Sequence, residues 1–299
     1  MSPQEIARIG TDDRIDELFA QIEASLEEAV AESAGTPPSL IAAASYALRG
    51  PSKRFRPLIL HLVAAGAEPD RSALRAGVAV EFVHTASLIL DDLPCMDDAQ
   101  LRRSRPATHL EFGEATAVLT AIALLNRAFG LLSELDISAD VRLRLVSLLE
   151  RAVGWQGLVA GQELDVAGIV ADREGLEQIN WLKTGTLFVA AVSMGAALRG
   201  LDGARSRHLE EFARELGMAF QLADDLSDRL ASASQLGKDV GQDRDKTNVI
   251  SLLGLEQTRD ACLNHLRRAD SALLTSTIDP EPIRAAINRG LRLPQLGGP

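Results

Sequence analysis

Apolar residues recur every three or four positions along much of this chain. One such run occupies residues 15–30 and has aspartate and glutamate on the opposite face, which predicts an amphipathic helix. Residues 118–132 repeat the same spacing. Residues 82–90 and 187–198 are instead apolar on nearly every side, which is typical of helices in the interior of a bundle. The pattern therefore predicts helices that pack around a common core.

Turn-forming residues interrupt this pattern, and most segments between them are longer than a typical strand. No shift of composition and no linker rich in serine and glycine divides the chain. We therefore expect a single domain over residues 1–299, with loose ends at 1–10 and 293–299. The expected breaks between helices are 35–38, 68–70, 104–106, 171–175, 199–203 and 279–282.

Composition supports an all-α fold and narrows the function. The 299 residues include only 8 Phe, 2 Trp and 1 Tyr, although strands favour aromatic residues. A net charge of -11 argues against nucleic acid as the main partner. The longest apolar stretches, 117–125 and 187–198, are shorter than the roughly 20 residues that a membrane span needs, so we expect no span. An acidic amino end unlike a signal peptide, and only two cysteines, predict a cytoplasmic location.

A first aspartate cluster follows the apolar stretch that ends at Leu90. An ideal helix would place Asp91 and Asp97 on different faces, but Pro94 lacks an N–H group and clashes with the carbonyl group of Leu90. We therefore expect the helix to end or distort there, so that Asp97 turns back toward Asp91. A run of aspartates can also be a solvated face or a helix cap. The apolar flanks favour a site that supplies positive charge, because an unpaired buried charge costs several kcal/mol.

A second aspartate cluster also follows an apolar stretch, and its members lie at helical spacing. Asp224 and Asp228 are one turn apart, and Asp225 and Asp228 are three residues apart, so the three carboxylates can converge on one face. Oxygen ligands select a hard cation, and the sequence contains no EF-hand loop. Since Mg²⁺ usually takes one or two carboxylates together with phosphate oxygens, the clusters predict a phosphorylated substrate bound through Mg²⁺.

Basic residues accompany these clusters in a chain that is acidic overall. Arg102 and Arg103 follow the first cluster closely, and Lys238 follows the second. Paired acidic and basic clusters are what a diphosphate site needs if it binds partly through Mg²⁺ and partly through direct hydrogen bonds to cations. The basic residues in this pattern are Lys53, Arg54, Arg56, Arg102, Arg103, Arg105, Lys183, Lys238 and Lys246.

One motif suggests a different chemistry. Glu81 and His84 have the Glu-x-x-His spacing of di-iron helical bundles, but those sites use the motif twice and this chain has it once. His84 lies two turns before Asp91 on the same face. It therefore either points toward the phosphate site or serves as a hydrogen-bonded core histidine. The sequence contains no Walker A loop and no nucleophile elbow.

Together these motifs resemble those of the isoprenyl diphosphate synthases, most closely the geranylgeranyl diphosphate synthases of bacterial carotenoid pathways. The resemblance implies an all-α, single-domain bundle of the isoprenoid synthase type with a central cavity, and a homodimer. It implies Mg²⁺-dependent, head-to-tail condensation of isopentenyl diphosphate with dimethylallyl, geranyl or farnesyl diphosphate. It extends over residues 40–255, and the matching motifs occupy residues 88–99, 101–109, 157–162, 183–185, 220–225 and 237–239.

The resemblance also implies roles for individual residues. About three Mg²⁺ ions would hold the allylic diphosphate, with Asp91, Asp92, Asp97, Asp224, Asp225 and Asp228 as ligands and Asp165 as a supporting carboxylate. Direct contacts to that diphosphate would come from Arg102, Lys183 and Lys238. Isopentenyl diphosphate would be bound by Lys53, Arg56, His84 and Arg103, and the developing carbocation would face Gln162, Thr184 and Gln221.

The chain departs from the family's pattern at three places. Ser104 stands where a glycine usually follows the two arginines, and residues 99–100 replace an acidic pair. Asp245 replaces the usual glycine before Lys246, another candidate diphosphate ligand, and can neutralise that lysine locally.

Product length is expected to depend on positions shortly before Asp91. In the resembling family a bulky aromatic residue five positions before this aspartate closes the tail pocket at C15, whereas here Ala86, followed by Ser87, leaves space. This favours geranylgeranyl diphosphate (C20) over farnesyl diphosphate (C15) and leaves C25 open, although Ala86 can also serve only to permit close helix packing. A non-catalytic partner subunit and a class I terpene cyclase are the competing classes. The first tends to lose its aspartates, and the second has no need of an isopentenyl diphosphate pocket.

Overall fold

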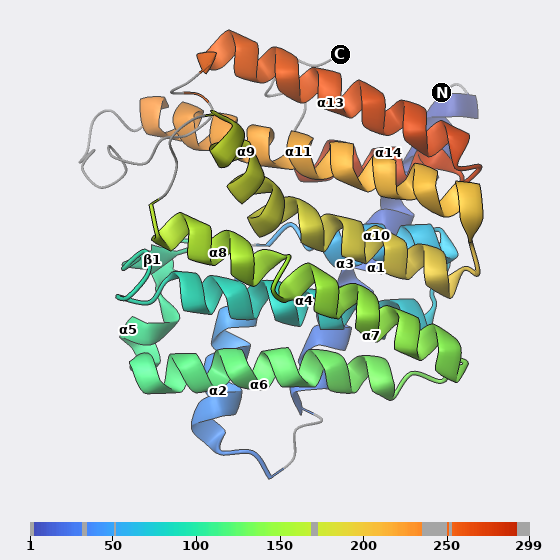
Figure 1. Ribbon diagram of the computed structural model, residues 1–299. Coiled ribbons are helices and arrows are strands. Elements are labelled where there is room, and N and C mark those ends of the chain that lie inside the picture. Colours follow the sequence, from blue (N-terminus) through green and yellow to red (C-terminus); the bar gives the residue numbers. More distant parts are fainter. Residues whose placement is uncertain are drawn as a thin grey trace. The chain divides into compact units, whose positions relative to one another are not determined.

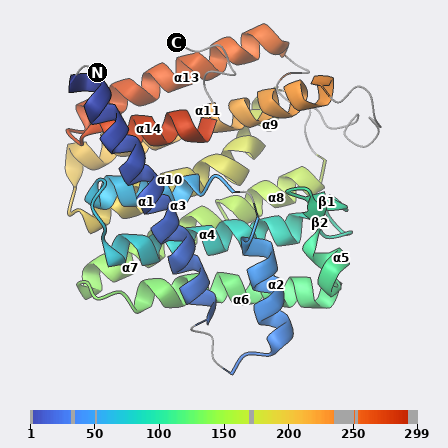
Figure 2. The ribbon, with the colours of Figure 1, turned by 180° about the vertical axis from the view of Figure 1, so that it is seen from behind.

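The computed structural model describes residues 3–31, 35–50, 52–168, 173–234, 250 and 253–291, with side chains except in 3–11, 173 and 228–234. Helices predominate throughout these ranges (Figures 1 and 2). Strands are limited, in the same ranges, to the two-residue segments β1 (Leu101–Arg102) and β2 (Arg105–Pro106). The predicted all-α class is therefore confirmed, while the expected break at 104–106 is a small antiparallel hairpin.

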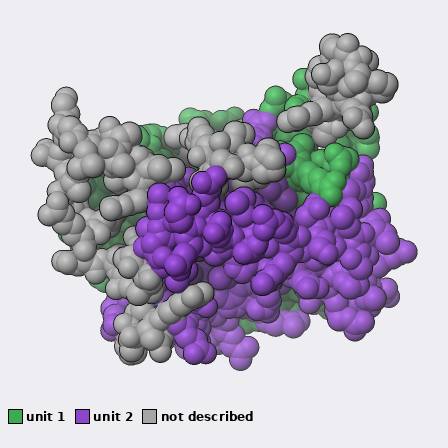
Figure 3. Space-filling model, turned by 90° about the horizontal axis from the view of Figure 1, so that it is seen from above, with its two compact units in different colours: residues 1–150, 193–201, 281–286 green, residues 151–192, 202–280, 287–299 purple. Residues whose placement is uncertain are grey.

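The chain divides into two compact units, which are coloured separately in Figure 3. Unit 1 comprises residues 1–150, 193–201 and 281–286, and unit 2 comprises residues 151–192, 202–280 and 287–299. Each unit is described by itself. The single domain and the central cavity expected from the sequence stay predictions.

Unit 1 is built around one central helix. α4 contacts α1, α3 and α6, and every residue from 76 to 83 is buried. The Asp70 side chain begins this helix by accepting a hydrogen bond from the Ala73 N–H at 2.7 Å, a typical N-cap contact. The helices of unit 1 are α1 (Pro3–Ala31), α2 (Pro38–Leu48), α3 (Phe55–Ala65), α4 (Arg71–Asp91), α5 (Thr108–Phe112), α6 (Glu114–Ser133) and most of α7 (Ala139–Val153).

Unit 2 combines a long helix pair with a shorter segment that departs from α-helical geometry. α11 and α13 pack side by side along much of their length, as both ribbon views show (Figures 1 and 2). The π-helical turn η1 contacts α8, α9 and α11. The elements of unit 2 are α8 (Leu158–Val166), α9 (Arg173–Asn180), η1 (Trp181–Gly185), most of α10 (Thr186–Leu198), α11 (Gly203–Ser234), α13 (Leu255–Thr275) and part of α14 (Pro280–Leu291).

The apolar patterns correspond to helices, but the boundaries differ in places. The amphipathic run at 15–30 lies within α1, which begins at Pro3, inside the segment 1–10 for which we expected a loose end. The runs at 118–132 and 187–198 lie within α6 and α10. The expected loose end at 293–299 lies outside the described residues.

Three helical segments are long and apolar enough to cross a membrane by length and composition alone: residues 71–91, 114–133 and 174–198. The length argument made from uninterrupted apolar stretches was therefore wrong, because small polar residues within these helices leave their mean hydropathy high. The absence of a membrane span stays a prediction.

Candidate active site

The first aspartate cluster lies in unit 1 where α4 ends. α4 ends at Asp91, and the Leu93 N–H bonds back to the Leu90 carbonyl oxygen at 3.2 Å. The chain then reverses, so that the Asp97 N–H donates to the Asp91 carbonyl oxygen at 3.0 Å. Pro94 lies within this reversal and, having no N–H group, leaves no donor unsatisfied there. The predicted end of the helix and the return of Asp97 are both confirmed for the backbone.

Arg102 reaches this turn from the hairpin. Its Nε donates to the two Asp92 carboxylate oxygens at 2.9 and 3.2 Å, its Nη2 also donates to Asp92, and Nη2 lies 3.8 Å from an Asp91 oxygen. Burial raises the pKa of the Asp92 carboxyl group, although Arg102 opposes this shift. Burial also opposes the charged form of Arg102, but its bonds to Asp92 and the nearby carboxylates raise its pKa overall. Asp92 is therefore already bound to Arg102, and a metal ion would have to share the Asp92 carboxylate with that arginine or displace it.

The hairpin that carries Arg102 turns through two residues in the left-handed region. Arg103 has a φ of 55° and Ser104 a φ of 63°. Positive φ at both central residues is the geometry of a type I′ turn, which favours glycine or asparagine because other side chains are strained there. The departure of Ser104 from the family's glycine therefore falls at a strained position.

His84 lies on α4 among arginine side chains. Its pKa is well below the ordinary value because burial disfavours the charged ring, and because the nearby charges of Arg56, Arg103, Arg54 and Arg102 do the same. The pKa of Arg103 is lowered as well, first by burial. A neutral imidazole surrounded by cations is well suited to bind an anion. Unit 1 thus brings His84, Arg56 and Arg103 together, as the prediction for isopentenyl diphosphate requires.

Arg54 has a structural role that the sequence did not reveal. Its side chain is 1% exposed, its Nε donates to Glu23 at 2.6 Å, and its Nη1 donates to Glu81 at 2.7 Å. Its Nη2 donates to the Leu48 carbonyl oxygen. Removal of Arg54 would leave the Glu81 carboxylate, 2% exposed, without this partner. Because Glu81 is bound to Arg54, it is not poised as a di-iron ligand beside His84.

Five predicted site residues form a second network, in unit 2. Lys183 Nζ donates to an Asp165 carboxylate oxygen at 2.5 Å. The Thr184 hydroxyl donates to the Gln221 side-chain oxygen at 2.9 Å, and the Gln221 amide nitrogen donates to an Asp225 carboxylate oxygen at 3.0 Å. Lys183 of η1 is therefore paired with a carboxylate of α8, and Thr184 of η1 is linked through Gln221 to a carboxylate of α11.

Glycines allow the turn that carries Lys183 to pack closely. A Cβ atom added at Gly185 would lie 2.2 Å from a Trp181 ring carbon, and one added at Gly161 would lie 2.7 Å from Leu182 Cβ. Neither distance is compatible with a side chain unless its neighbours move. Short π-helical turns are rare in proteins overall, and those that occur often lie at functional sites. The predicted motifs at 157–162 and 183–185 thus lie side by side, with Gly161 packed against Leu182 and the backbone of Lys183.

The remaining predicted residues are placed as follows. Ala86 is fully buried, and the Ser87 hydroxyl donates to the His84 carbonyl oxygen at 2.8 Å. Lys53 is exposed. Gln162 and Asp224 are partly exposed residues of unit 2. Lys238, Lys246 and the side chain of Asp228 lie outside the described residues, so the convergence of the three carboxylates in the second cluster stays a prediction.

The carboxylates of the candidate site suit a Mg²⁺ ion whose coordination is completed by substrate oxygens better than a metal ion held by protein ligands alone. Among the described side chains, no group of three or more His, Cys, Asp or Glu residues is positioned to hold a metal ion. Mg²⁺ usually keeps waters and takes only one or two carboxylates beside phosphate oxygens. The carboxylates at the end of α4 and on α11 suit that kind of coordination.

Within an all-α fold, carboxylates beside arginine and lysine side chains suit the class of proteins that bind phosphorylated substrates. Residues 37–286 match the family described as Polyprenyl synthetase, and the chain belongs to that family. It is 37% identical over 282 residues to the farnesyl diphosphate synthase of Geobacillus stearothermophilus, covering 92% of this chain and 95% of that one. It is 38% identical over 269 residues to the geranylgeranyl diphosphate synthase of Pantoea ananas, covering 88% of each.

A solved structure supports the same conclusion. The geranyltransferase of Helicobacter pylori complexed with magnesium and isoprenyl diphosphate superposes with a TM-score of 0.78 at 27% identity, covering 95% of this chain and 98% of that one. The predicted resemblance to isoprenyl diphosphate synthases is confirmed, and the protein is a prenyltransferase of that family. Relatives that make farnesyl and geranylgeranyl diphosphate are similar to it to the same degree.

Proposed function

We propose that this protein is a geranylgeranyl diphosphate synthase, which condenses isopentenyl diphosphate head to tail with allylic diphosphates up to C20. The observation that carries the proposal is the arginine cluster around His84, seven residues before the first aspartate of the family motif. A neutral imidazole among cations suits the diphosphate of the second substrate, which a terpene cyclase does not bind. The full set of six aspartates argues against a non-catalytic partner subunit.

We assign the isopentenyl diphosphate to unit 1, where Arg56, His84 and Arg103 would bind its phosphate oxygens, joined by the exposed Lys53. Arginine is suited to this task because its planar guanidinium group can donate two parallel hydrogen bonds to a phosphate. The neutral His84 ring can donate one N–H without adding to the positive charge that already surrounds it.

We assign the allylic diphosphate to both aspartate clusters, with direct contacts from Arg102, Lys183 and Lys238, and with Lys246 as a weaker candidate. When the substrate arrives, Arg102 would exchange part of its bond to Asp92 for a phosphate oxygen, and Lys183 would do the same with Asp165. These cations then stabilise the charge that develops on the departing diphosphate.

Bound Mg²⁺, about three ions in all, would supply further positive charge to that leaving group and so favour ionisation of the allylic C–O bond. The residues suited to hold it are Asp91, Asp92, Asp97, Asp224, Asp225 and Asp228, with Asp165 in support.

The allylic carbocation is then attacked by the isopentenyl double bond. The oxygens of Thr184 and Gln221, already hydrogen-bonded to each other, would orient dipoles toward this cation, and Gln162 would add a third. The new C–C bond leaves a cation on the former isopentenyl unit, which loses a proton to restore a double bond. We assign the released diphosphate as the proton acceptor, so no protein base is needed.

The experiment that tests the proposal is incubation with Mg²⁺, isopentenyl diphosphate and C5, C10 or C15 allylic primers, followed by product-length analysis. We expect each primer to be extended to C20. Products that stop at C15 would identify a farnesyl diphosphate synthase instead, and no consumption of isopentenyl diphosphate with any primer would refute the proposed activity.

Product length is tested further at Ala86, five residues before Asp91. Each helical residue advances about 1.5 Å, so a growing chain that follows α4 away from Asp91 passes this position after one to two turns. Ala86→Tyr should shift the main product from C20 to C15 and preserve turnover. Ala86→Ser, which adds one oxygen atom, is the matched control and should keep C20. An unchanged product from a folded Ala86→Tyr enzyme would show that Ala86 serves only close helix packing.

We further propose a cytoplasmic homodimer that supplies carotenoid synthesis. The relatives named above include an enzyme with the predicted C20 product, and a chain with only two cysteines suits a reducing compartment. Sedimentation of the purified protein tests the oligomeric state.

A further inference from the structure

The hairpin that carries Arg102 and Arg103 has little stability of its own. Its strands contain two residues each, and both residues of its turn have positive φ values. Even longer two-stranded hairpins are marginal in water. The positions of the two arginines must therefore be fixed by contacts with the rest of unit 1.

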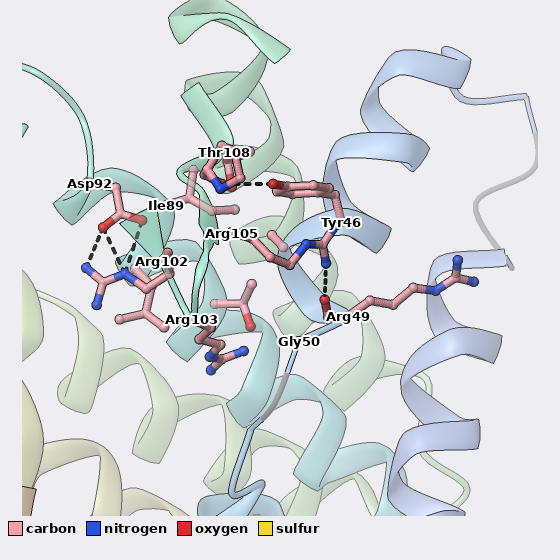
Figure 4. A pocket seen from close by; sticks show the side chains of 13 residues that line it. Tyr46, Arg49, Gly50, Ile89, Asp92, Arg102, Arg103, Arg105 and Thr108 are labelled. Carbon is pink, nitrogen blue, oxygen red and sulfur yellow. Dashed lines mark hydrogen bonds and ion pairs between the residues drawn. The ribbon is translucent and has the colours of Figure 1, made fainter. Parts of the chain in front are cut away.

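Those contacts come from the carboxyl end of α2, as Figure 4 shows. The Tyr46 hydroxyl donates to the Pro106 carbonyl oxygen at 2.9 Å. The Arg105 guanidinium carbon lies 3.8 Å from the centre of the Tyr46 ring, and Arg105 Nη1 donates to the Arg49 carbonyl oxygen at 2.5 Å. Arg105 thus combines a cation–π contact with a bond to a carbonyl group that the helix end leaves without an internal partner.

Two further contacts complete this support. The rings of Tyr46 and Phe112 of α5 pack in a T-shaped arrangement, with 5.3 Å between ring centres and an angle of 73°. A Cβ atom at Gly50 would lie 3.2 Å from Arg103 Cδ, so the stem of Arg103 lies against bare backbone. Tyr46 is therefore held on one side by α5 while it binds the hairpin, and the hairpin is anchored to α2 through β2 and through its turn.

The two arginines depend on this support to different degrees. Arg102 has a second anchor, because it donates to both oxygens of the buried Asp92. Arg103 makes no hydrogen bond to a carboxylate among the described side chains, and the nearby charges act on it in both directions, since Glu81 and Glu23 favour its charged form while Arg54 and Arg102 oppose it. Loosening of the hairpin should therefore displace Arg103 more than Arg102.

We infer that Tyr46 and Arg105 form a latch that positions Arg103 for isopentenyl diphosphate. They are positioning residues, since they act through Arg103 and not on the substrate. The expected change in KM for isopentenyl diphosphate rests on the proposed function, whereas the expected loosening of the hairpin does not.

Arg105→Ala and Tyr46→Phe test the latch, with Arg49→Ala as the matched control. Arg49 and Arg105 carry the same charge in the same region, but the Arg49 side chain points away from the hairpin in Figure 4 and lies 3.5 Å from Glu27. Arg49→Ala keeps the carbonyl oxygen that binds Arg105. The control therefore removes an equal charge and leaves the latch in place.

We expect Arg105→Ala to raise the KM for isopentenyl diphosphate roughly tenfold, and Tyr46→Phe roughly threefold, as the loss of hydrogen bonds and a cation–π contact suggests. The KM for the allylic primer and kcat should change by less than about twofold, and Arg49→Ala should change none of the three beyond that. An equal rise in both KM values, the same rise in Arg49→Ala, or a lower melting temperature with no change in KM would overturn the inference.

Amide hydrogen exchange of residues 100–107 supplies a readout that does not depend on catalysis. The Ala107 N–H donates to the Gln100 carbonyl oxygen at 3.1 Å at the base of the hairpin, and this bond should open more often when the latch is broken. Exchange should accelerate in Arg105→Ala and Tyr46→Phe but not in Arg49→Ala. Unchanged exchange in both latch variants would overturn the latch even in an active enzyme. An inactive wild-type protein with accelerated exchange in the variants would instead overturn only the proposed function.

Discussion

The charged groups of the candidate site are arranged differently in the two units. In unit 1, the arginines around His84 repel one another, and their charges together with burial lower the pKa of the ring. In unit 2, Lys183 is already paired with Asp165, and the neighbouring polar groups are hydrogen-bonded to one another. Among the arginines of the first group, Arg54 binds Glu23 and Glu81 and Arg102 binds Asp92, whereas Arg103 makes no hydrogen bond to a carboxylate among the described side chains. In the second group the cation already has a carboxylate partner, so Lys183 must give up an internal bond to bind a ligand.

This difference means that the charged groups of the two units affect ligand binding and the stability of the free protein in different ways. A cluster of like charges stores electrostatic repulsion that a bound anion relieves, so unit 1 is prepared for its ligand at the expense of the free protein. A paired network stabilises the free protein and weakens the net gain on binding. Substitution of Arg103 in unit 1 and of Lys183 in unit 2 should therefore change function in the same direction and stability in opposite directions.

The largest expected effect comes from breaking the aspartate cluster of either unit. Asp91→Ala in unit 1 and Asp225→Ala in unit 2 should each lower kcat by about a thousandfold or more, because the proposed function assigns both carboxylates to Mg²⁺ bound to the same diphosphate. Steady-state rates with a C15 primer measure the effect, and excess EDTA should abolish the wild-type rate.

The matched control for these variants is Asp98→Asn. Asp98 belongs to the same turn but has no assigned role, and its φ of 47° is tolerated by asparagine. Its rate should stay within about twofold of the wild type. Near-normal turnover in Asp91→Ala or Asp225→Ala would contradict a shared function of the two clusters.

A second experiment compares the two units directly. Arg103→Ala should weaken isopentenyl diphosphate binding by about 10- to 100-fold, yet leave the free energy of unfolding unchanged or higher, because it removes a like charge. Lys183→Ala should weaken binding of the allylic primer and lower the free energy of unfolding by about 1 kcal/mol, because Asp165 loses its ion pair.

The KM values measure the change in substrate binding, and urea denaturation measures the change in the free energy of unfolding. Arg75→Ala, which removes an exposed ion pair with Glu134 elsewhere in unit 1, controls for the loss of any cation. A destabilised Arg103→Ala together with an unaffected Lys183→Ala would reverse the comparison.

A third prediction concerns pH and follows from the lowered pKa of His84. Between its folded-state pKa and the ordinary value of 6.5, the unfolded chain binds a proton that the folded protein does not. The free energy of unfolding should therefore fall as pH is lowered through this window. His84→Gln should flatten the slope, and His61, whose pKa burial also lowers, should keep part of it.

Binding of isopentenyl diphosphate should shift the protonation of His84 in the opposite direction, toward the charged ring. Its negative charge offsets the surrounding arginines and should raise the pKa of His84, which NMR titration of the ring resonances can follow. A His84 pKa that does not change at saturating isopentenyl diphosphate would mean that the ligand binds elsewhere.

The smallest expected effect is at the strained turn of the hairpin. Ser104→Gly should raise the free energy of unfolding by about 0.5–1 kcal/mol, because glycine adopts a positive φ without steric cost. Thermal denaturation measures this change. Ser104→Ala keeps the strain and should bring no gain, so an equal stabilisation by both variants would rule out relief of backbone strain as the cause.

The sequence predicted best those features that depend on neighbouring residues. The helix end near Pro94 and the reversal that brings Asp97 back follow from the geometry of proline, and the structure agrees. The helices themselves follow from apolar spacing. Lys183, Thr184 and Gln221 were named as candidate site residues from their motifs, but the hydrogen bonds that join Thr184 to Gln221 and Lys183 to Asp165 were not predicted.

Features that depend on distant partners could not be read from the sequence. Arg54 finds Glu23 and Glu81 at separations of 31 and 27 residues, and no local pattern distinguishes it from Arg56, which has a different environment. Tyr46 meets Pro106 across 60 residues. The π-helical turn depends on the space that glycines leave for neighbouring helices, which composition alone does not reveal.

The position of Arg54 in the chain also bears on how the protein forms during synthesis. Glu23 and Leu48 precede it, but Glu81 emerges 27 residues later, which corresponds to about 1–5 s of translation. Until then, burial of the guanidinium group lacks one of its two carboxylates and is unfavourable. We therefore expect α1, α2 and α3 to stay loosely associated on the ribosome and to pack together only when α4 arrives with both its apolar surface and Glu81. The buried arginine thus makes early folding of this unit a concerted event.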